Sequence, residues 1–336
     1  MDIQTLEKID KQKMYKVYDK WPEIAKNSFE LQKYTENFEN IGHIVFGGMG
    51  GSGTLGDMFE SILSKTKIHV NVVKGYVLPR TVNSNTLVII TSVSGNTAEA
   101  LSLLESAKKI GTKIIVFSSG GKIQEYCLKN NIKFISVTRY HSPRATFPSF
   151  LYTMLKVLYQ TLKIKKENII NSIEELEILQ RKINSLNLTE DNVSLNLAKS
   201  IKLIPIIYYP SGLQSASIRF KNSLQENTKM HASSEDVIEA SHNGVVSWER
   251  KSDVMPILIR GSEDHIKTKE RYKILKEFFI EKEIKYEEVI SIEGNILSKL
   301  ITLIYLLDYA TIYKAVMDNI DPSPVNSIEF IKKKIE

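Results

Sequence analysis

The chain has 336 residues, of which 42% are hydrophobic and 25% are charged. This composition supports substantial hydrophobic cores, and the length predicts about two domains. The formal net charge is +6, but the basic residues are spread along the chain and mixed with acids. We therefore expect a solvated surface and no nucleic-acid partner.

The single cysteine, Cys127, excludes an internal disulfide, and no cysteine–histidine spacing suggests a zinc site. The first residues read as polar and helical, without the pattern of a signal peptide. No apolar run reaches the ~18 residues expected of a membrane span. These features predict a cytoplasmic protein without a membrane partner.

Residues 1–40 have the pattern of one or two amphipathic helices. Five short apolar runs follow and predict strands, with helical patterns between most of them, notably at 97–110 and 124–130; the runs are 43–46, 69–73, 86–91, 113–117 and 133–137. Such alternation is typical of a parallel sheet covered on both faces.

Residues 148–185 predict long helices, and a charged, Asn-rich stretch near 183–196 predicts a linker. A second alternation follows. Strands are predicted at 204–209, 254–260 and near Val289; helices are predicted at 213–230, 267–281, 296–317 and after Pro324. Two α/β units of similar size are therefore expected, although the halves show no obvious sequence repeat.

The first predicted strand runs into Gly47-Gly-Met-Gly-Gly-Ser-Gly53, directly before a helical pattern. Glycines let a ligand approach the backbone N–H groups, and a helix N-terminus favours an anion. The segment also matches G-x-G-x-x-G, which leaves a dinucleotide open. However, Lys74-Gly75 follows the second strand where a dinucleotide fold normally has an acid. A monophosphate fits better.

The third predicted strand ends in Thr91-Ser-Val-Ser-Gly-Asn-Thr97, and Ser118-Ser-Gly-Gly121 follows the fourth. Ser92, Ser94 and Thr97 could simply cap the next helix. Capping needs one such residue, however, and three hydroxyls beside a glycine favour a phosphate cradle.

The segments Gly48-Met-Gly-Gly-Ser-Gly53 and Ser92-Val-Ser-Gly-Asn-Thr97 resemble the sugar isomerase (SIS) domain, which binds phosphosugars. The second half resembles the bifunctional phosphoglucose/phosphomannose isomerase family more specifically. That similarity is carried by Arg219-Phe-Lys-Asn-Ser-Leu-Gln-Glu-Asn-Thr-Lys229, Glu239-Ala-Ser-His-Asn243 and Asp321-Pro-Ser-Pro-Val-Asn-Ser-Ile-Glu-Phe-Ile-Lys332.

The resemblance implies an α/β fold of two SIS-type subdomains, each a parallel sheet flanked by helices in a three-layer αβα sandwich. The expected division is an N-terminal helical extension (1–40), a first, phosphate-binding SIS domain (41–185) and a second SIS domain with a C-terminal helix (197–336). The implied activity interconverts glucose 6-phosphate and fructose 6-phosphate, and also mannose 6-phosphate, by proton transfer through a cis-enediol.

The same resemblance assigns the base to Glu226, which must reach both C1 and C2. Read without the motif, Glu226 is a helix-surface acid paired with Lys229. His242 and Lys332, the first of three consecutive lysines, are the implied ring-opening groups. Arg144 would stabilise the enediol oxyanion. The expected substrate-binding residues are Gly51, Ser52, Ser92, Ser94, Thr97 and Arg144.

No metal or cofactor is implied. The expected partners are phosphorylated hexoses and a second copy of the chain, in a homodimer whose active sites combine groups from both subunits. Two alternatives stay open: a non-catalytic phosphosugar-binding SIS protein, and an amino-sugar-phosphate deaminase or deglycase. Val325 stands where a threonine of the family has been linked to accepting both C2 epimers, so the mannose activity depends on this position.

Overall fold

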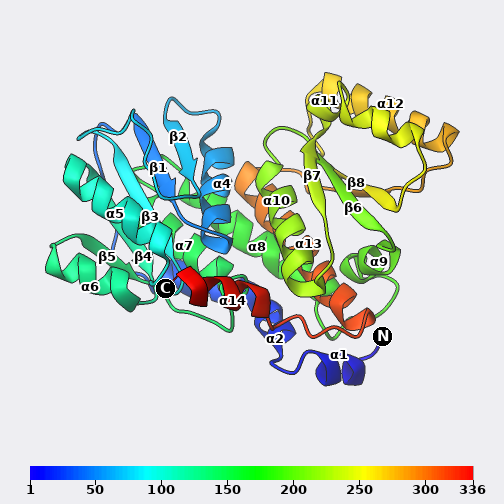
Figure 1. Ribbon diagram of the computed structural model, residues 1–336, viewed down its shortest axis with the longest axis horizontal. Coiled ribbons are helices and arrows are strands. Elements are labelled where there is room, and N and C mark those ends of the chain that lie inside the picture. Colours follow the sequence, from blue (N-terminus) through cyan, green and yellow to red (C-terminus); the bar gives the residue numbers. More distant parts are fainter. Residues whose placement is uncertain (336) are drawn as a thin grey trace.

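The computed structural model describes residues 1–335 and contains two parallel β-sheets, each with helices on both faces (Figure 1). Strand order is β2-β1-β3-β4-β5 in the first sheet and β7-β6-β8-β9 in the second. Every strand pair is parallel. The predicted α/β class with two three-layer αβα units is confirmed.

Three helices precede the first sheet, where one or two were predicted: α1 (Ile3–Ile9), α2 (Met14–Asp19) and α3 (Trp21–Glu30). The strands of the first sheet are β1 (His43–Gly47), β2 (His69–Val73), β3 (Leu87–Ser92), β4 (Lys113–Ser118) and β5 (Lys133–Ser136). Its helices are α4 (Gly51–Leu63), α5 (Ala98–Ile110), α6 (Gly121–Lys129), α7 (Phe147–Leu158) and α8 (Lys166–Ile183).

The stretch predicted as a linker is structured. It includes the start of α9 (Val193–Ser200), which Asn192 caps by accepting a hydrogen bond from the Leu195 N–H. Asn192 also donates to the carbonyl groups of Ile183 and Asn187, so the asparagines of this stretch stabilise turns.

The second sheet contains β6 (Ile204–Tyr209), β7 (Ser233–Asp236), β8 (Val254–Arg260) and β9 (Glu287–Ile290). Its helices are α10 (Gln214–Ser223), α11 (Val237–Ala240), α12 (Ile266–Glu281), α13 (Ile296–Met317) and α14 (Asn326–Ile335); a π-helical turn, Leu224–Thr228, follows α10, and a 3₁₀ turn spans Gly244–Glu249. The sequence did not predict β7, because its Ser-Ser-Glu-Asp sequence has no apolar alternation and pairs only along one edge with β6.

Strand residues alternate between two hydrophobic cores, as the two-residue period of a strand requires. In the first sheet, Phe46 and Ile89 face the large central core, whereas Val45 and Val88 face a smaller one beneath α5 and α6. In the second sheet, Ile257 faces the central core. The central core is therefore shared by both sheets, and α4 and α10 contact each other between them (Figure 1).

Helix α13 is long and apolar enough to span a membrane, yet 89% of its most apolar window is buried inside the protein. Its apolarity is explained by its position, since it contacts α8, α9 and α10. It is a core helix.

Candidate functional site

The order β2-β1-β3-β4-β5 changes direction between β1 and β3. In open parallel sheets, ligands bind at such a switch point, beyond the carboxyl ends of the strands. The glycine loop follows β1, the Ser92–Thr97 loop follows β3, and Ser118–Gly121 follows β4. The three polar loops found in the sequence therefore share one edge of the sheet, with the first two on either side of its switch point.

The hydroxyls of the β3 loop are not used for capping. Thr97 is the N-cap residue of α5 but makes no side-chain capping bond. Its Oγ1 instead lies 3.0 Å from Ser92 Oγ, which also accepts a hydrogen bond from the Gly95 N–H at 3.1 Å. Ser94 Oγ accepts from the Asn96 N–H at 3.3 Å. The capping alternative is wrong for Thr97, and these hydroxyls remain able to donate to a phosphate.

The β3 and β4 loops pack closely because Gly95 has no side chain. Its φ is +70°, and a Cβ atom there would lie 1.7 Å from the carbonyl oxygen of Gly120. Within residues 1–335, the buried hydroxyl of Ser119 in the β4 loop has no hydrogen-bond partner. A buried polar atom without a hydrogen-bond partner is uncommon. A bound ligand that forms a hydrogen bond with this hydroxyl would explain it.

Gly51 and Ser52 begin α4, whose first N–H groups are the polar end of a 13-residue helix. A Cβ atom on Gly51 would lie 3.6 Å from the carbonyl oxygen of Pro143 and 3.7 Å from Nη1 of Arg219. The N-terminus of α4 therefore adjoins both the loop before α7 and helix α10 of the second half. This contact joins the edge that carries the three polar loops to Arg219 and to the loop of Arg144.

Arg144 is not a surface residue, since only 4% of its side chain is exposed. Its Nη1 donates to Glu226 Oε2 at 2.9 Å, and its Nε donates to Asn227 Oδ1 at 2.6 Å. Its Nη2 donates to the carbonyl oxygens of Pro322 and Ser323 at 2.6 and 3.0 Å. Four hydrogen bonds fix the guanidinium group in one orientation beside the carboxylate.

Glu226 lies in the π-helical turn rather than in a continuous helix over 213–230. Such turns are rare and are frequently found at functional sites. Its side chain is 27% exposed. Lys229 donates to the Glu226 backbone carbonyl at 2.5 Å rather than to its carboxylate, so the alternative set aside from the sequence, a surface ion pair between the two, is wrong. The pKa of Lys229 is lowered by burial and then by the nearby Arg144.

The sequence did not lead us to predict a buried ion pair that adjoins Arg144, namely Arg219 with Asp308. Arg219 and Asp308 are 2% and 0% exposed, and their closest atoms are 2.6 Å apart. Burial alone would lower the pKa of Arg219, but the Asp308 carboxylate outweighs it and the pKa is raised. One signal was available: Asp308 is the one acid of α13, and Asp is almost never fully buried unless it is paired.

The single chain does not bring every predicted residue to this site. His242 is exposed just beyond α11 and makes no side-chain hydrogen bond within residues 1–335. Lys332 lies on α14, which has no buried residue. In Figure 1, α11 lies at the outer edge of the second half, far from α14. Neither residue forms a hydrogen bond or ion pair with Arg144 or Glu226 in the described part of the chain.

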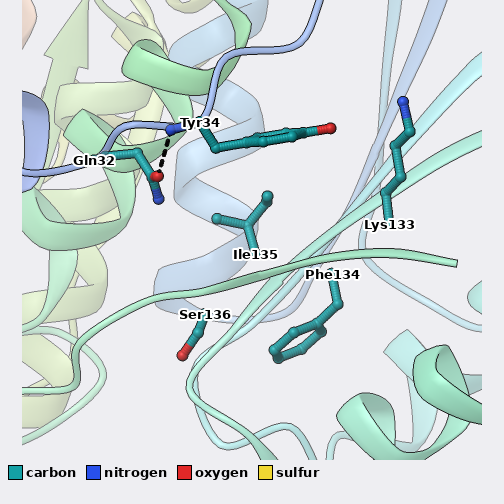
Figure 2. A pocket seen from close by; sticks show the side chains of 6 residues that line it. All are labelled: Gln32, Tyr34, Lys133, Phe134, Ile135 and Ser136. Carbon is teal, nitrogen blue, oxygen red and sulfur yellow. Dashed lines mark hydrogen bonds between the residues drawn. The ribbon is translucent and has the colours of Figure 1, made fainter.

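A separate hollow lies beside the edge strand β5 and does not coincide with these residues. Figure 2 shows its lining, which includes the ring of Tyr34 and the side chains of Lys133 and Ile135. The Tyr34 N–H donates to Gln32 Oε1 at 2.9 Å there. None of the predicted catalytic or phosphate-binding residues lines it, so we do not assign the active site to it.

Comparison with known protein families shows which class of domain the chain contains. The SIS domain family matches residues 37–154, and the bacterial phospho-glucose isomerase C-terminal SIS domain family matches residues 190–335. Among solved structures, a hypothetical protein from Thermus thermophilus superposes with a TM-score of 0.78 at 14% identity, covering 99% of this chain and 92% of that protein. The protein is built from two SIS domains.

Curated relatives define the family. A bifunctional phosphoglucose/phosphomannose isomerase from Caldicellulosiruptor bescii is 32% identical and aligns over 94% of this chain and 96% of its own length. One of the same name from Aquifex aeolicus is 28% identical, over 92% of this chain and 95% of its own. The chain belongs to the bifunctional phosphoglucose/phosphomannose isomerase family.

Proposed function

We propose that this chain is an aldose–ketose isomerase that interconverts glucose 6-phosphate and fructose 6-phosphate, and also mannose 6-phosphate. The observation that carries the proposal is the buried Arg144 fixed 2.9 Å from the Glu226 carboxylate. Relatives aligned over nearly the whole chain are named as isomerases, which favours this activity over a non-catalytic binding protein or an amino-sugar-phosphate deaminase.

In this proposal the first SIS domain (41–185) holds the phosphate and the second (197–336) supplies the base. The phosphate accepts hydrogen bonds from the N–H groups at the start of α4, including Gly51, and from hydroxyl groups. The hydroxyl donors are Ser52, Ser92, Ser94 and Thr97.

Glu226 removes the proton from C2 of the aldose and returns it to C1, which requires one base near both carbons. The electrons of the C2–H bond form the C1–C2 double bond, the carbonyl electrons move onto O1, and Arg144 stabilises the negative charge that develops there. The proton on O2 then moves to O1, and the double bond takes up the returning proton at C1 as the C2 carbonyl forms. A fixed cation in a site with little water is worth far more than one in bulk water. Before these steps, on substrate binding, substrate oxygens replace the carboxylate as one partner of the guanidinium, which frees Glu226 to act as the base.

Ring opening moves a proton from O1 to O5, and we assign it to His242 and Lys332. Because His242 is exposed and forms no hydrogen bond or ion pair with Glu226 among the described residues, we propose a homodimer in which it completes the partner's site. The exposed apolar side chains of α14, Phe330 (65% exposed) and Ile331 (57%), support burial of this helix against a second copy.

Mixing two inactive variants tests the shared site. A Glu226→Gln subunit paired with a His242→Ala subunit contains one site with both wild-type groups. Random exchange should then restore roughly a quarter of the wild-type activity. Mixtures that stay inactive after subunit exchange would mean that the two groups belong to the same subunit.

We propose a cytoplasmic location. Cys127 is free and buried, which is usual for proteins of a reducing compartment.

Replacing Glu226 by Gln tests the assignment of the base. The variant keeps an oxygen that can accept from Arg144, so it should bind phosphosugar but lose turnover by several orders of magnitude. Glu270→Gln is the matched control, since among residues 1–335 Glu270 pairs only with Lys267 and its side chain is 50% exposed; it should keep the wild-type rate. Full turnover of the Glu226 variant would show that another group is the base.

A further inference from the structure

Helix α3 of the N-terminal segment contacts the loop that carries Arg144, and α2 contacts helix α13. The carbonyl groups of Arg144 and Ala145 lie just before α7, where no helical N–H reaches them, and both residues are buried. Buried carbonyl groups need a hydrogen-bond donor. Each of the two carbonyl groups accepts a hydrogen bond from a side chain outside the loop.

Trp21, the first residue of α3, supplies one donor. Its Nε1–H donates to the Ala145 carbonyl at 3.1 Å. The indole is fully buried and stacks between Tyr18, at 4.5 Å between ring centroids, and Tyr305, at 5.2 Å. This packing on both faces holds the donor in one direction.

Arg219 supplies the other donor, and its orientation also depends on the N-terminal segment. Its Nη2 donates to the Arg144 carbonyl at 2.7 Å and to Asp308 Oδ2 at 2.6 Å. The same Asp308 oxygen accepts from the hydroxyl of Tyr18, in α2, at 3.1 Å. A continuous series of buried hydrogen bonds therefore runs from Tyr18 through Asp308 and Arg219 to Arg144.

We propose that the N-terminal helices position Arg144: Trp21 and Tyr18 fix the backbone on which the oxyanion-stabilising guanidinium is carried. This inference rests on the proposed isomerase function. Trp21 and Tyr18 touch no substrate; they are positioning residues. A misplacement of about 1 Å at a reacting group can cost on the order of 100-fold in rate, so loss of either donor lowers kcat, whereas KM changes little because the loops that bind the phosphate are unaffected.

The test removes one donor at a time from the full chain. Tyr18→Phe deletes only the hydroxyl group, and Trp21→Phe deletes the indole N–H. Tyr152→Phe is the matched control, because its hydroxyl is equally buried but is bonded to Ser172 within the core. The isomerase activity of each variant is measured with fructose 6-phosphate at a temperature well below its melting temperature. We expect kcat to fall about 10- to 100-fold for Trp21→Phe and by less for Tyr18→Phe, with KM changed less than about threefold.

A second background separates positioning from general destabilisation. In an Arg144→Lys protein, the guanidinium is already absent, so Tyr18→Phe should cost no further kcat. The Tyr152→Phe control should lose stability without losing kcat. Wild-type kcat in both donor variants, with an active wild-type enzyme, would overturn the positioning role and leave the isomerase assignment intact. A wild-type protein without turnover would overturn both.

Discussion

The buried carboxylate of Asp308 gives a prediction whose magnitude follows from its surroundings. It accepts hydrogen bonds from three side chains: Arg219 through Nε and Nη2, Tyr18 through its hydroxyl, and Ser223 through Oγ at 2.7 Å. Asn has nearly the same shape, but Asp308→Asn removes the negative charge. The Arg219 side chain, which is only 2% exposed, then loses the carboxylate that pairs with it. Removing one partner of a buried ion pair costs about 3–5 kcal/mol.

This cost converts into a measurable change in melting temperature. An unfolding entropy of about 2.1 cal/mol/K per residue means that a chain of 336 residues loses roughly 1.4 °C per kcal/mol. Asp308→Asn should therefore melt about 4–7 °C below the wild type, as followed by circular dichroism at 222 nm.

The matched control is Glu277→Gln on α12. Glu277 pairs with Lys273 at i,i+4, and the two side chains are 58% and 78% exposed, so the change should cost about 0.5 kcal/mol or less. If Asp308→Asn melted no lower than this control, the Arg219–Asp308 pair would not be a buried, strongly coupled pair, and the series of hydrogen bonds to Arg144 would lose its support.

Three further predictions concern other parts of the molecule. Ser92→Ala should raise KM for fructose 6-phosphate at least about tenfold with little change in melting temperature; an unchanged KM would remove Ser92 from the phosphate site. Burial pushes the pKa of Glu288 up, but hydrogen bonds from Arg260 and Lys276 outweigh it and lower the pKa below 4.5. A lowered folded-state pKa gives stability that is present above pH 4.5 and lost as the pH falls through the folded pKa. The melting-temperature difference between wild type and Glu288→Gln should thus be largest near pH 7 and shrink in acid; a pH-independent difference would contradict this. Burial raises the pKa of Cys127 to about 11, so a thiol reagent at pH 8 should react only after denaturation, and rapid labelling of native protein would contradict the buried position.

Much of the fold could be predicted because local patterns and tertiary structure agree. The strands at 69–73 and 204–209 and the helix at 296–317 have the predicted bounds. Where prediction failed, long-range contacts decide the structure. The strand β7 has no apolar pattern and exists because β6 offers it an edge, and the π-helical turn after Ser223 depends on Asn227, which donates to Thr311 of α13 at 2.7 Å.

The candidate site likewise combines features that local sequence patterns predict with features that depend on long-range contacts. The meeting of the three polar loops was predictable, since glycines and hydroxyls after successive strands lie at one edge of a parallel sheet. That Arg144 and Glu226 belong to one site was expected only from the family motifs, because 82 residues separate them in the chain, and the ion pair between them was not predicted. The contacts of Trp21 and Arg219 with the Arg144 loop left no local signal, since they join residues 124 and 75 positions apart in the chain.

The measurement that bears most directly on the central claim is product formation from fructose 6-phosphate by the purified protein in the presence of a metal chelator. NMR of the reaction in D₂O identifies both aldose phosphates and the hydrogen at C2. Base catalysis through a cis-enediol predicts glucose 6-phosphate and mannose 6-phosphate, with solvent deuterium at C2 in part of each, and no turnover by Glu226→Gln. Formation of neither aldose phosphate by the wild-type protein would contradict the assignment.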